Sequence, residues 1–133
     1  MAPEPPPARS DAAIAELAGM VVVPLRNTHL NEDADTLSGD LSARIAASRP
    51  RCLILDLSAI TALDSHEFAA LVRLARLARL LGCETVAARV TPGVAACLVM
   101  IGADPAGIRF SRDMNSILLR HAGPAPHGIA RGA

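Results

Sequence analysis

The sequence predicts an α/β domain in which helices cover a sheet with substantial parallel pairing. After the first strands, helical and strand patterns alternate in the order α-β-α-β-α-β-α, which is typical of such sheets. The length of 133 residues is that of a single domain with a real core. Hydrophobic residues make up 51% of the chain, with no Trp, no Tyr and two Phe, so we expect an aliphatic core.

The N-terminal part contains a leader and one ambiguous segment. Residues 1–11 are rich in proline, which predicts a flexible leader before a domain over residues 12–120. Residues 12–18 fit either a short helix capped by Ser10 or Asp11, or a first strand that turns at Gly19. Residues 20–25 form a β-branched run that predicts a strand. Because Pro24 cannot donate to a ladder, we expect an edge or a bulge there.

The middle of the chain predicts two helices around a strong strand. A polar loop over residues 26–31 leads to a helix over 32–48, whose apolar residues recur every four positions. Residues 52–57 form the second strand, and residues 66–81 the next helix, ended by Gly82. The inward stripe of that helix is predicted to comprise Phe68, Leu71, Val72, Ala75, Ala78 and Leu81, with Arg73, Arg76 and Arg79 on a more solvated side.

The C-terminal part continues the alternation. Residues 84–90 predict a strand, and Pro92 and Gly93 open a helix that runs through Ile101. Residues 108–110 predict a short strand, and Ser111 is placed to cap a last helix that ends at Arg120. Residues 121–133 have no periodicity and are expected to form a flexible tail.

Charge and composition exclude several classes of function. The 13 basic and 13 acidic residues balance, so the chain has no basic footprint for nucleic acid or for an anionic membrane. No apolar run approaches the roughly 18 residues of a membrane span. The odd set of Cys52, Cys83 and Cys97 argues against a disulfide framework and for a reducing, cytoplasmic location.

The candidate functional site lies where the helix over 66–81 begins. If Asp64 caps this helix, Glu67 falls three residues later and can complete a capping box. Ser65 then occupies the first helical position, with its hydroxyl facing solvent. A phosphoryl group there would add about −1.5 to −2 charge to the surface without touching the core. The alternative is that Asp64 or Ser65 is only a cap, worth about 1 kcal/mol.

Catalysis and metal binding find no support in the sequence. The four histidines show no ligand spacing with each other or with the cysteines. Ser65 and His66 suggest a nucleophile and a base only superficially, because adjacent helical side chains diverge and no third group is evident. No glycine-rich phosphate loop occurs. We therefore expect no catalytic residue, no metal and no cofactor.

Several motifs together resemble the STAS domain, the family of bacterial anti-sigma-factor antagonists. They are residues 20–25, 52–58, 63–65, 80–86, 91–95 and 101–102. The loop before Ser65, the Leu-Leu-Gly helix end and the Thr-Pro-Gly-Val-Ala helix start are most similar to RsbS-type stressosome scaffold proteins. The resemblance covers residues 12–120. The order and spacing of the motifs make it fairly specific.

The resemblance implies a STAS fold, with a mixed sheet of four to five strands and helices mainly on one face. It implies a non-enzymatic regulator that binds a serine kinase, an anti-sigma factor of the histidine-kinase-like ATPase class. That kinase would phosphorylate Ser65, and a PP2C-type phosphatase would reverse the modification. The partner would contact Asp64, Ser65, His66 and Glu67, and STAS paralogues would co-assemble with the chain. The alternative is a structural assembly or ligand-sensing subunit in which Ser65 is only a helix cap.

Overall fold

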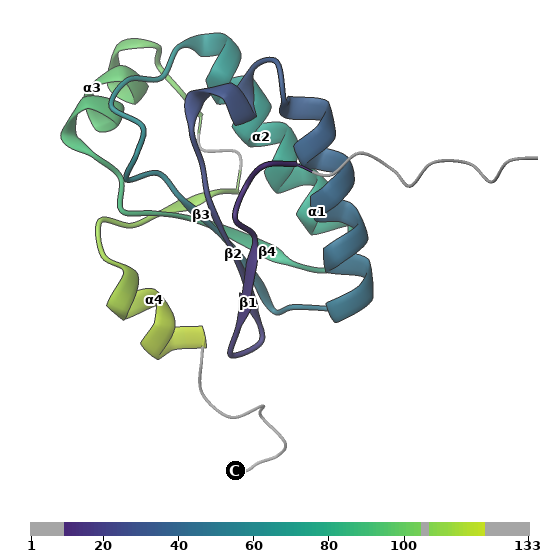
Figure 1. Cartoon of the computed structure of the whole chain (residues 1–133). Helices are drawn as coiled ribbons and strands as arrows, with labels where there is room; N and C mark the ends of the chain where they lie inside the picture. The colour runs from purple at the N-terminus through teal and green to yellow at the C-terminus, as the bar shows by residue number, and fades with distance from the viewer. Residues whose placement is uncertain (1–9, 105–106, 122–133) are drawn as a thin grey trace, which may run out of the picture.

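The computed structural model of the chain describes residues 10–104 and 107–121 (Figure 1). Its five-stranded sheet has the order β1-β2-β3-β4-β5, from β1 (Ala15–Leu17), β2 (Met20–Pro24), β3 (Cys52–Asp56), β4 (Glu84–Ala88) and β5 (Arg109–Phe110). The helices are η1 (Asn27–Leu30), α1 (Ala34–Ser48), α2 (Ser65–Leu80), α3 (Pro92–Met100) and α4 (Met114–His121). Residues 1–9 of the expected leader and 122–133 of the expected tail lie outside the described residues.

The ambiguous segment before residue 19 is a strand. β1 pairs antiparallel with β2, and the remaining neighbours are all parallel, so the sheet is mixed as expected. Ala18 and Gly19 join the hairpin with φ of 52° and 80°, the positive values that a tight two-residue turn requires. The alternative of a short helix capped by Ser10 or Asp11 is therefore wrong.

Pro24 lies at an unpaired edge, as expected. β1 pairs with β2 only as far as Val22. Leu25 N donates to the carbonyl of Asp56 in β3 at 2.9 Å, so the preceding nitrogen, which has no hydrogen, faces the side where β1 has ended. The proline thus costs the sheet no hydrogen bond.

Helices cover mainly one face of the sheet, again as expected. α1 and α2 lie side by side on that face (Figure 1). The aliphatic core beneath them includes Val21, Leu53 and Leu55 from the sheet and Leu41 and Leu71 from the helices, each at most 1% exposed. A smaller cluster on the opposite face packs against α4, and its buried members are Met20, Cys52, Ile54, Val86, Ala88 and Ile117.

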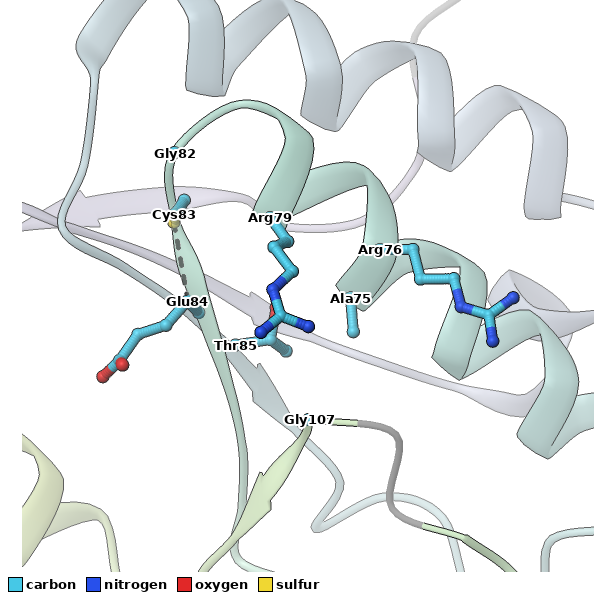
Figure 2. A pocket seen from close by; sticks show the side chains of 8 residues that line it. All are labelled: Ala75, Arg76, Arg79, Gly82, Cys83, Glu84, Thr85 and Gly107. Carbon is cyan, nitrogen blue, oxygen red and sulfur yellow. Dashed lines mark hydrogen bonds between the residues drawn. The ribbon is translucent and has the colours of Figure 1, made fainter.

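The buried face of α2 differs in part from the predicted stripe. Leu71, Val72, Ala75 and Ala78 are buried as predicted, and Glu67, Ala70 and Leu74 are buried as well. Phe68 is only half-buried, and Leu81 is 40% exposed because the helix has ended before it. Arg73, Arg76 and Arg79 are exposed as predicted, with Arg79 beside the start of β4 (Figure 2).

Most other predicted boundaries are correct within two residues. The predicted loop over 26–31 contains η1, and the strand over 84–90 ends at Ala88 because Arg89 has a φ of 56°. The predicted cap of α4 is wrong. Asp113, not Ser111, accepts the N–H of Asn115 at 2.8 Å, and Ser111 accepts the N–H of Asp113. None of the helices described in residues 10–121 is long and apolar enough to cross a membrane.

Candidate functional site

The start of α2 is a complete capping box, as the spacing of Asp64 and Glu67 predicts. Asp64 has extended backbone angles, and its side chain accepts the N–H of Glu67 at 2.7 Å. In return, the Glu67 side chain accepts the N–H of Asp64 at 3.0 Å. Each residue thus satisfies an otherwise unpaired donor of the first helical turn. The cap is Asp64, and Ser65 is the first residue of the helix.

Glu67 also ties α2 to the η1 segment. Its second carboxylate oxygen accepts the amide groups of Asn27 at 2.7 Å and of Asn31 at 2.8 Å. Asn27 donates further to the carbonyl of Ala62 at 3.1 Å, so the loop before the helix is held from the same side. Burial alone would raise the pKa of Glu67, but the N–H of Asp64 and the two amides outweigh it and lower that pKa. Glu67 is therefore a buried, ionised anchor of the loop.

Ser65 and His66 are presented to solvent by this anchored turn. Both side chains are exposed. No hydrogen bond joins the two residues within the described chain, and the Ser65 hydroxyl is not used for capping. The four predicted site residues therefore divide into two supporting side chains, Asp64 and Glu67, and two accessible ones. A modifying enzyme could reach the Ser65 hydroxyl without unfolding the helix.

An ion pair between the buried Asp56 and the half-exposed Arg89 anchors the first part of the loop over residues 57–64. The Arg89 guanidinium binds both carboxylate oxygens of Asp56, at 3.1 and 2.7 Å, and also the hydroxyl of Ser58 at 3.0 Å. Ser58 N donates to Asp56 at 3.0 Å. Burial would raise the pKa of Asp56, but these bonds from Arg89 and Ser58 outweigh it and lower that pKa. These bonds hold the first residues of the loop against the end of β3.

The middle of the loop packs against the start of α3. Thr91 caps α3 through the N–H of Val94, and its hydroxyl donates to the carbonyl of Ile60 at 2.9 Å. Gly93 lies so close to the loop that a Cβ atom there would overlap the carbonyl oxygen of Thr61. The glycine of the Pro-Gly helix start is thus required by a close backbone approach. The loop before Ser65 and the start of α3 form one packed unit.

Sequence reasoning did not find Asn27, Asn31 or Arg89. The two asparagines stand four residues apart in a polar loop, a spacing that places them on one side of a helical turn. Nothing local indicates that they face Glu67, which follows 36 positions or more later. Arg89 likewise reaches Asp56 across 33 positions.

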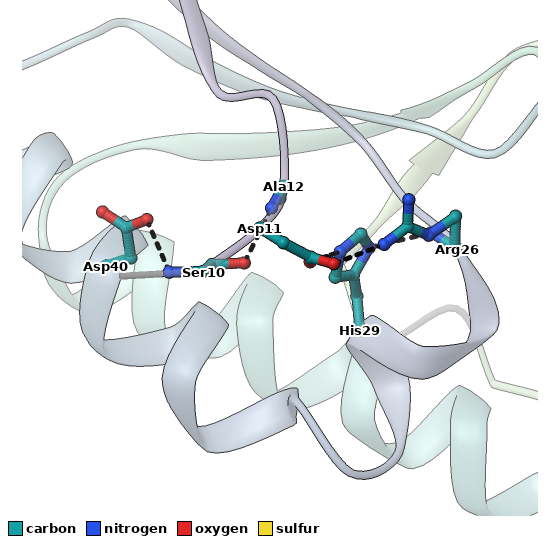
Figure 3. Close-up of polar contacts among 6 residues, drawn as sticks. All are labelled: Ser10, Asp11, Ala12, Arg26, His29 and Asp40. Atoms are coloured by element: carbon teal, nitrogen blue, oxygen red, sulfur yellow. Dashed lines mark hydrogen bonds and ion pairs between the residues drawn. The ribbon is translucent and has the colours of Figure 1, made fainter. Parts of the chain in front are cut away.

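The one buried histidine of the described chain is structural (Figure 3). Arg26 N donates to Nδ1 of His29 at 2.9 Å, so the proton of the neutral ring lies on Nε2, which donates to Asp11 at 2.7 Å. Arg26 also pairs with Asp11 at 2.6 Å. The hydrogen bond from His29, above all, lowers the pKa of Asp11. Nearby, Ser10 N donates to Asp40 of α1 at 3.3 Å, so the chain before β1 is held against the domain.

The buried cysteines are core thiols. Burial raises the pKa of Cys52 to about 12 and that of Cys83 to about 11, so neither is a thiolate at neutral pH. In residues 10–104 and 107–121, His, Cys, Asp and Glu form no group of three that could hold a metal ion.

A family model for the STAS domain matches residues 11–115. The chain belongs to the STAS domain family. The match includes the loop over residues 57–64, the start of α3 that packs against it, and most of the described domain. It agrees with the resemblance of the sequence and with the mixed five-stranded sheet. No curated protein sequence matches this STAS domain significantly.

Solved structures give the same result. A form of RsbS from Moorella thermoacetica with a serine-to-glutamate substitution is 25% identical to this STAS domain, with a TM-score of 0.69. The match covers 80% of this chain and 93% of that one. A chain from a structure of the stressosome, a signal integration and transduction hub, is 26% identical. Its TM-score is also 0.69, and the match again covers 80% of this chain and 93% of that one.

A more distant relative shows the fold alone. An anti-sigma-factor antagonist (STAS) domain protein from Planctomyces limnophilus is 18% identical, with a TM-score of 0.64. That match covers 86% of this chain and all of the other chain. Together the comparisons establish the STAS fold and its similarity to stressosome and antagonist proteins.

Proposed function

We propose that this STAS domain is a non-enzymatic antagonist that binds a serine kinase through the start of α2 and is released when Ser65 is phosphorylated. The kinase would be an anti-sigma factor or switch kinase of the histidine-kinase-like ATPase class. The observation that supports the proposal best is the exposed Ser65 hydroxyl, which the Asp64–Glu67 box leaves free of any capping role. Asp64 and His66 complete the proposed contact surface, and the buried Glu67 supports it from within the domain.

The electrostatics of the turn suit a reversible switch. A phosphoryl group on Ser65 would meet the positive end of the α2 dipole, which favours it, and the carboxylate of Asp64, which opposes it. The Glu67 carboxylate is already bound by three donors and is buried, so its structural role need not change. Phosphorylation would thus add a hydrated anion to the docking surface while the fold stays intact. A PP2C-type phosphatase would restore the binding form.

Assembly with STAS paralogues is the second candidate function. The similarity to a stressosome chain and to RsbS favours it. In this alternative the chain is a structural or ligand-sensing subunit, and Ser65 has no switching role. The expectation that Ser65 would be the helix cap in this alternative is wrong, because Asp64 occupies the cap position.

A capture experiment from native lysate distinguishes the two functions. Tagged wild-type protein and the Ser65→Asp and Ser65→Ala variants are compared by quantitative mass spectrometry of the bound proteins. The matched control is Asn115→Asp, which adds the same charge to an exposed position in the first turn of α4. Mapping of phosphate on wild-type protein incubated with lysate and ATP identifies the modified residue.

We expect an ATPase-type kinase to be bound by wild type, Ser65→Ala and Asn115→Asp, and to be lost with Ser65→Asp. Phosphate should be incorporated at Ser65 and not into Ser65→Ala. Equal recovery of the kinase by wild type and Ser65→Asp would contradict the switch. Recovery of STAS paralogues alone, by all four proteins, would favour assembly.

A further inference from the structure

A pocket of about 290 Å³ lies at the opposite end of α2 from Ser65 (Figure 2). It opens between the last turns of α2, the start of β4 and the residue that leads into β5. The residues around it are Ala75, Arg76, Arg79, Gly82, Cys83, Glu84, Thr85 and Gly107. The volume is close to the lower end, roughly 300 Å³, of cavities that hold small molecules. A ligand of this site would therefore be small.

Thr85 contributes a buried hydroxyl without a partner. The residue is 4% exposed, and its Oγ1 has no hydrogen-bond partner among the residues that the structure describes. Buried side-chain oxygens are nearly always hydrogen-bonded, so this atom calls for a missing partner. Side chains alternate along β4, and Thr85 faces α2 while the Glu84 side chain extends the other way (Figure 2). The acidic neighbour thus does not occupy the place in front of the hydroxyl.

Two arginines without acidic partners line the same pocket as this hydroxyl. Neither Arg76 nor Arg79 makes a hydrogen bond or an ion pair with any described residue, in contrast to Arg89, which is paired. Figure 2 shows Arg79 reaching from α2 to Thr85, while Arg76 leaves the helix one turn earlier and its side chain extends away from Thr85, beyond Ala75. Arg79 also ends near Gly107, where an added Cβ would stand 3.5 Å from its Nη1. Guanidinium groups match the geometry of phosphate and similar oxyanions.

We propose that this pocket binds a small molecule that carries a phosphate group. Arg79 would pair with the phosphate oxygens, with Arg76 adding positive charge at the edge of the pocket, and the Thr85 hydroxyl would donate the hydrogen bond that it lacks in the free protein. The site is separate from Ser65 and does not depend on the switch. Its chemistry explains both the unpaired arginines and the unpartnered hydroxyl.

Calorimetric titration of the full chain with inorganic pyrophosphate and with glycerol phosphate, at low ionic strength, tests the site. The variants are Arg79→Gln and Thr85→Val, which removes the hydroxyl but keeps the side-chain shape. The control is Arg73→Gln, because Arg73 is exposed on the same helix but does not line the pocket. Thermal unfolding of each variant shows that it is folded.

We expect at least one of the two probes to bind, with about a tenfold rise in Kd for Arg79→Gln and for Thr85→Val. Arg73→Gln should leave Kd unchanged. Thr85→Val should unfold at the same temperature as wild type or higher, since it removes an unsatisfied buried atom. Absence of binding by both probes would overturn the proposal. So would an equal loss in Arg73→Gln, which indicates unspecific attraction, or unchanged binding by Thr85→Val.

Discussion

Removal of the Glu67 carboxylate should loosen the segment that presents Ser65. Glu67→Ala deletes one capping bond, worth about 1 kcal/mol, and two amide bonds to a buried carboxylate. Each amide bond should contribute about 1 kcal/mol, less than the roughly 1.5–3 kcal/mol usual for a charged acceptor, because the freed amides of Asn27 and Asn31 can regain water. The free energy of unfolding should therefore fall by about 3 kcal/mol. Glu67→Gln, which keeps the shape and one acceptor, should lose about half as much.

Urea unfolding followed by circular dichroism measures both losses, provided that the m-value is unchanged. Glu32→Gln is the control, since Glu32 is exposed nearby, and it should change stability by less than about 0.5 kcal/mol. A loss below about 1 kcal/mol for Glu67→Ala would refute the reasoning. It would mean that the network is a consequence of the fold and does not hold the loop.

The stabilisation that Glu67 contributes should depend on pH in a definite direction. Although burial opposes ionisation, the hydrogen bonds make the pKa of Glu67 lower in the folded chain than its ordinary value of 4.5. The folded state thus binds this proton less tightly than the unfolded state. The stabilisation is fully present above about pH 4.5 and is lost as pH falls through the folded pKa. The difference between wild type and Glu67→Gln should narrow below about pH 4.5, and a constant difference would contradict the assignment.

Two further predictions concern packing and thiol reactivity. Gly93→Ala should lower the free energy of unfolding by about 1–3 kcal/mol, because its Cβ overlaps the carbonyl of Thr61. Gly39→Ala, in α1 with nothing within 4 Å, should instead raise it by about 0.5–1 kcal/mol; equal effects in chemical unfolding would refute the contact. Cys52 and Cys83, whose pKa values burial raises to about 12 and 11, should resist iodoacetamide at neutral pH until the chain unfolds. Mass spectrometry of the intact protein checks this, and rapid labelling of either in the native state would contradict it.

The sequence predicts the local geometry of the fold well where the signal repeats at short range. The positions of Leu37, Leu41 and Ile45 give the buried face of α1, and the i to i+3 spacing of Asp64 and Glu67 gives the capping box. The turn at Ala18 escaped a definite prediction because alanine rarely adopts a positive φ. There the pairing of β1 with β2 outweighs the local preference.

The supporting part of the site could not be predicted, because it depends on contacts between distant segments. Glu67 was expected to complete the cap and to contact a partner, but its bonds to Asn27 and Asn31 involve a segment with no strong pattern of its own. The pairing of Asp56 with Arg89 likewise requires the register of β3 and β4 to be known. The unpaired hydroxyl of Thr85 emerges only when every neighbour has been placed.

The close approach of Gly93 to Thr61 has a consequence for how the molecule opens. The loop over 57–64 is bonded to Ala88, Arg89 and Thr91, so neither it nor the start of α3 can detach without breaking the other's contacts. The two connections should therefore exchange their amide hydrogens as one cooperative unit. A protein that binds the loop beside Ser65 would also restrain α3. A structural change in α3 would in turn alter the loop before Ser65, although the two segments lie about 30 positions apart in the chain.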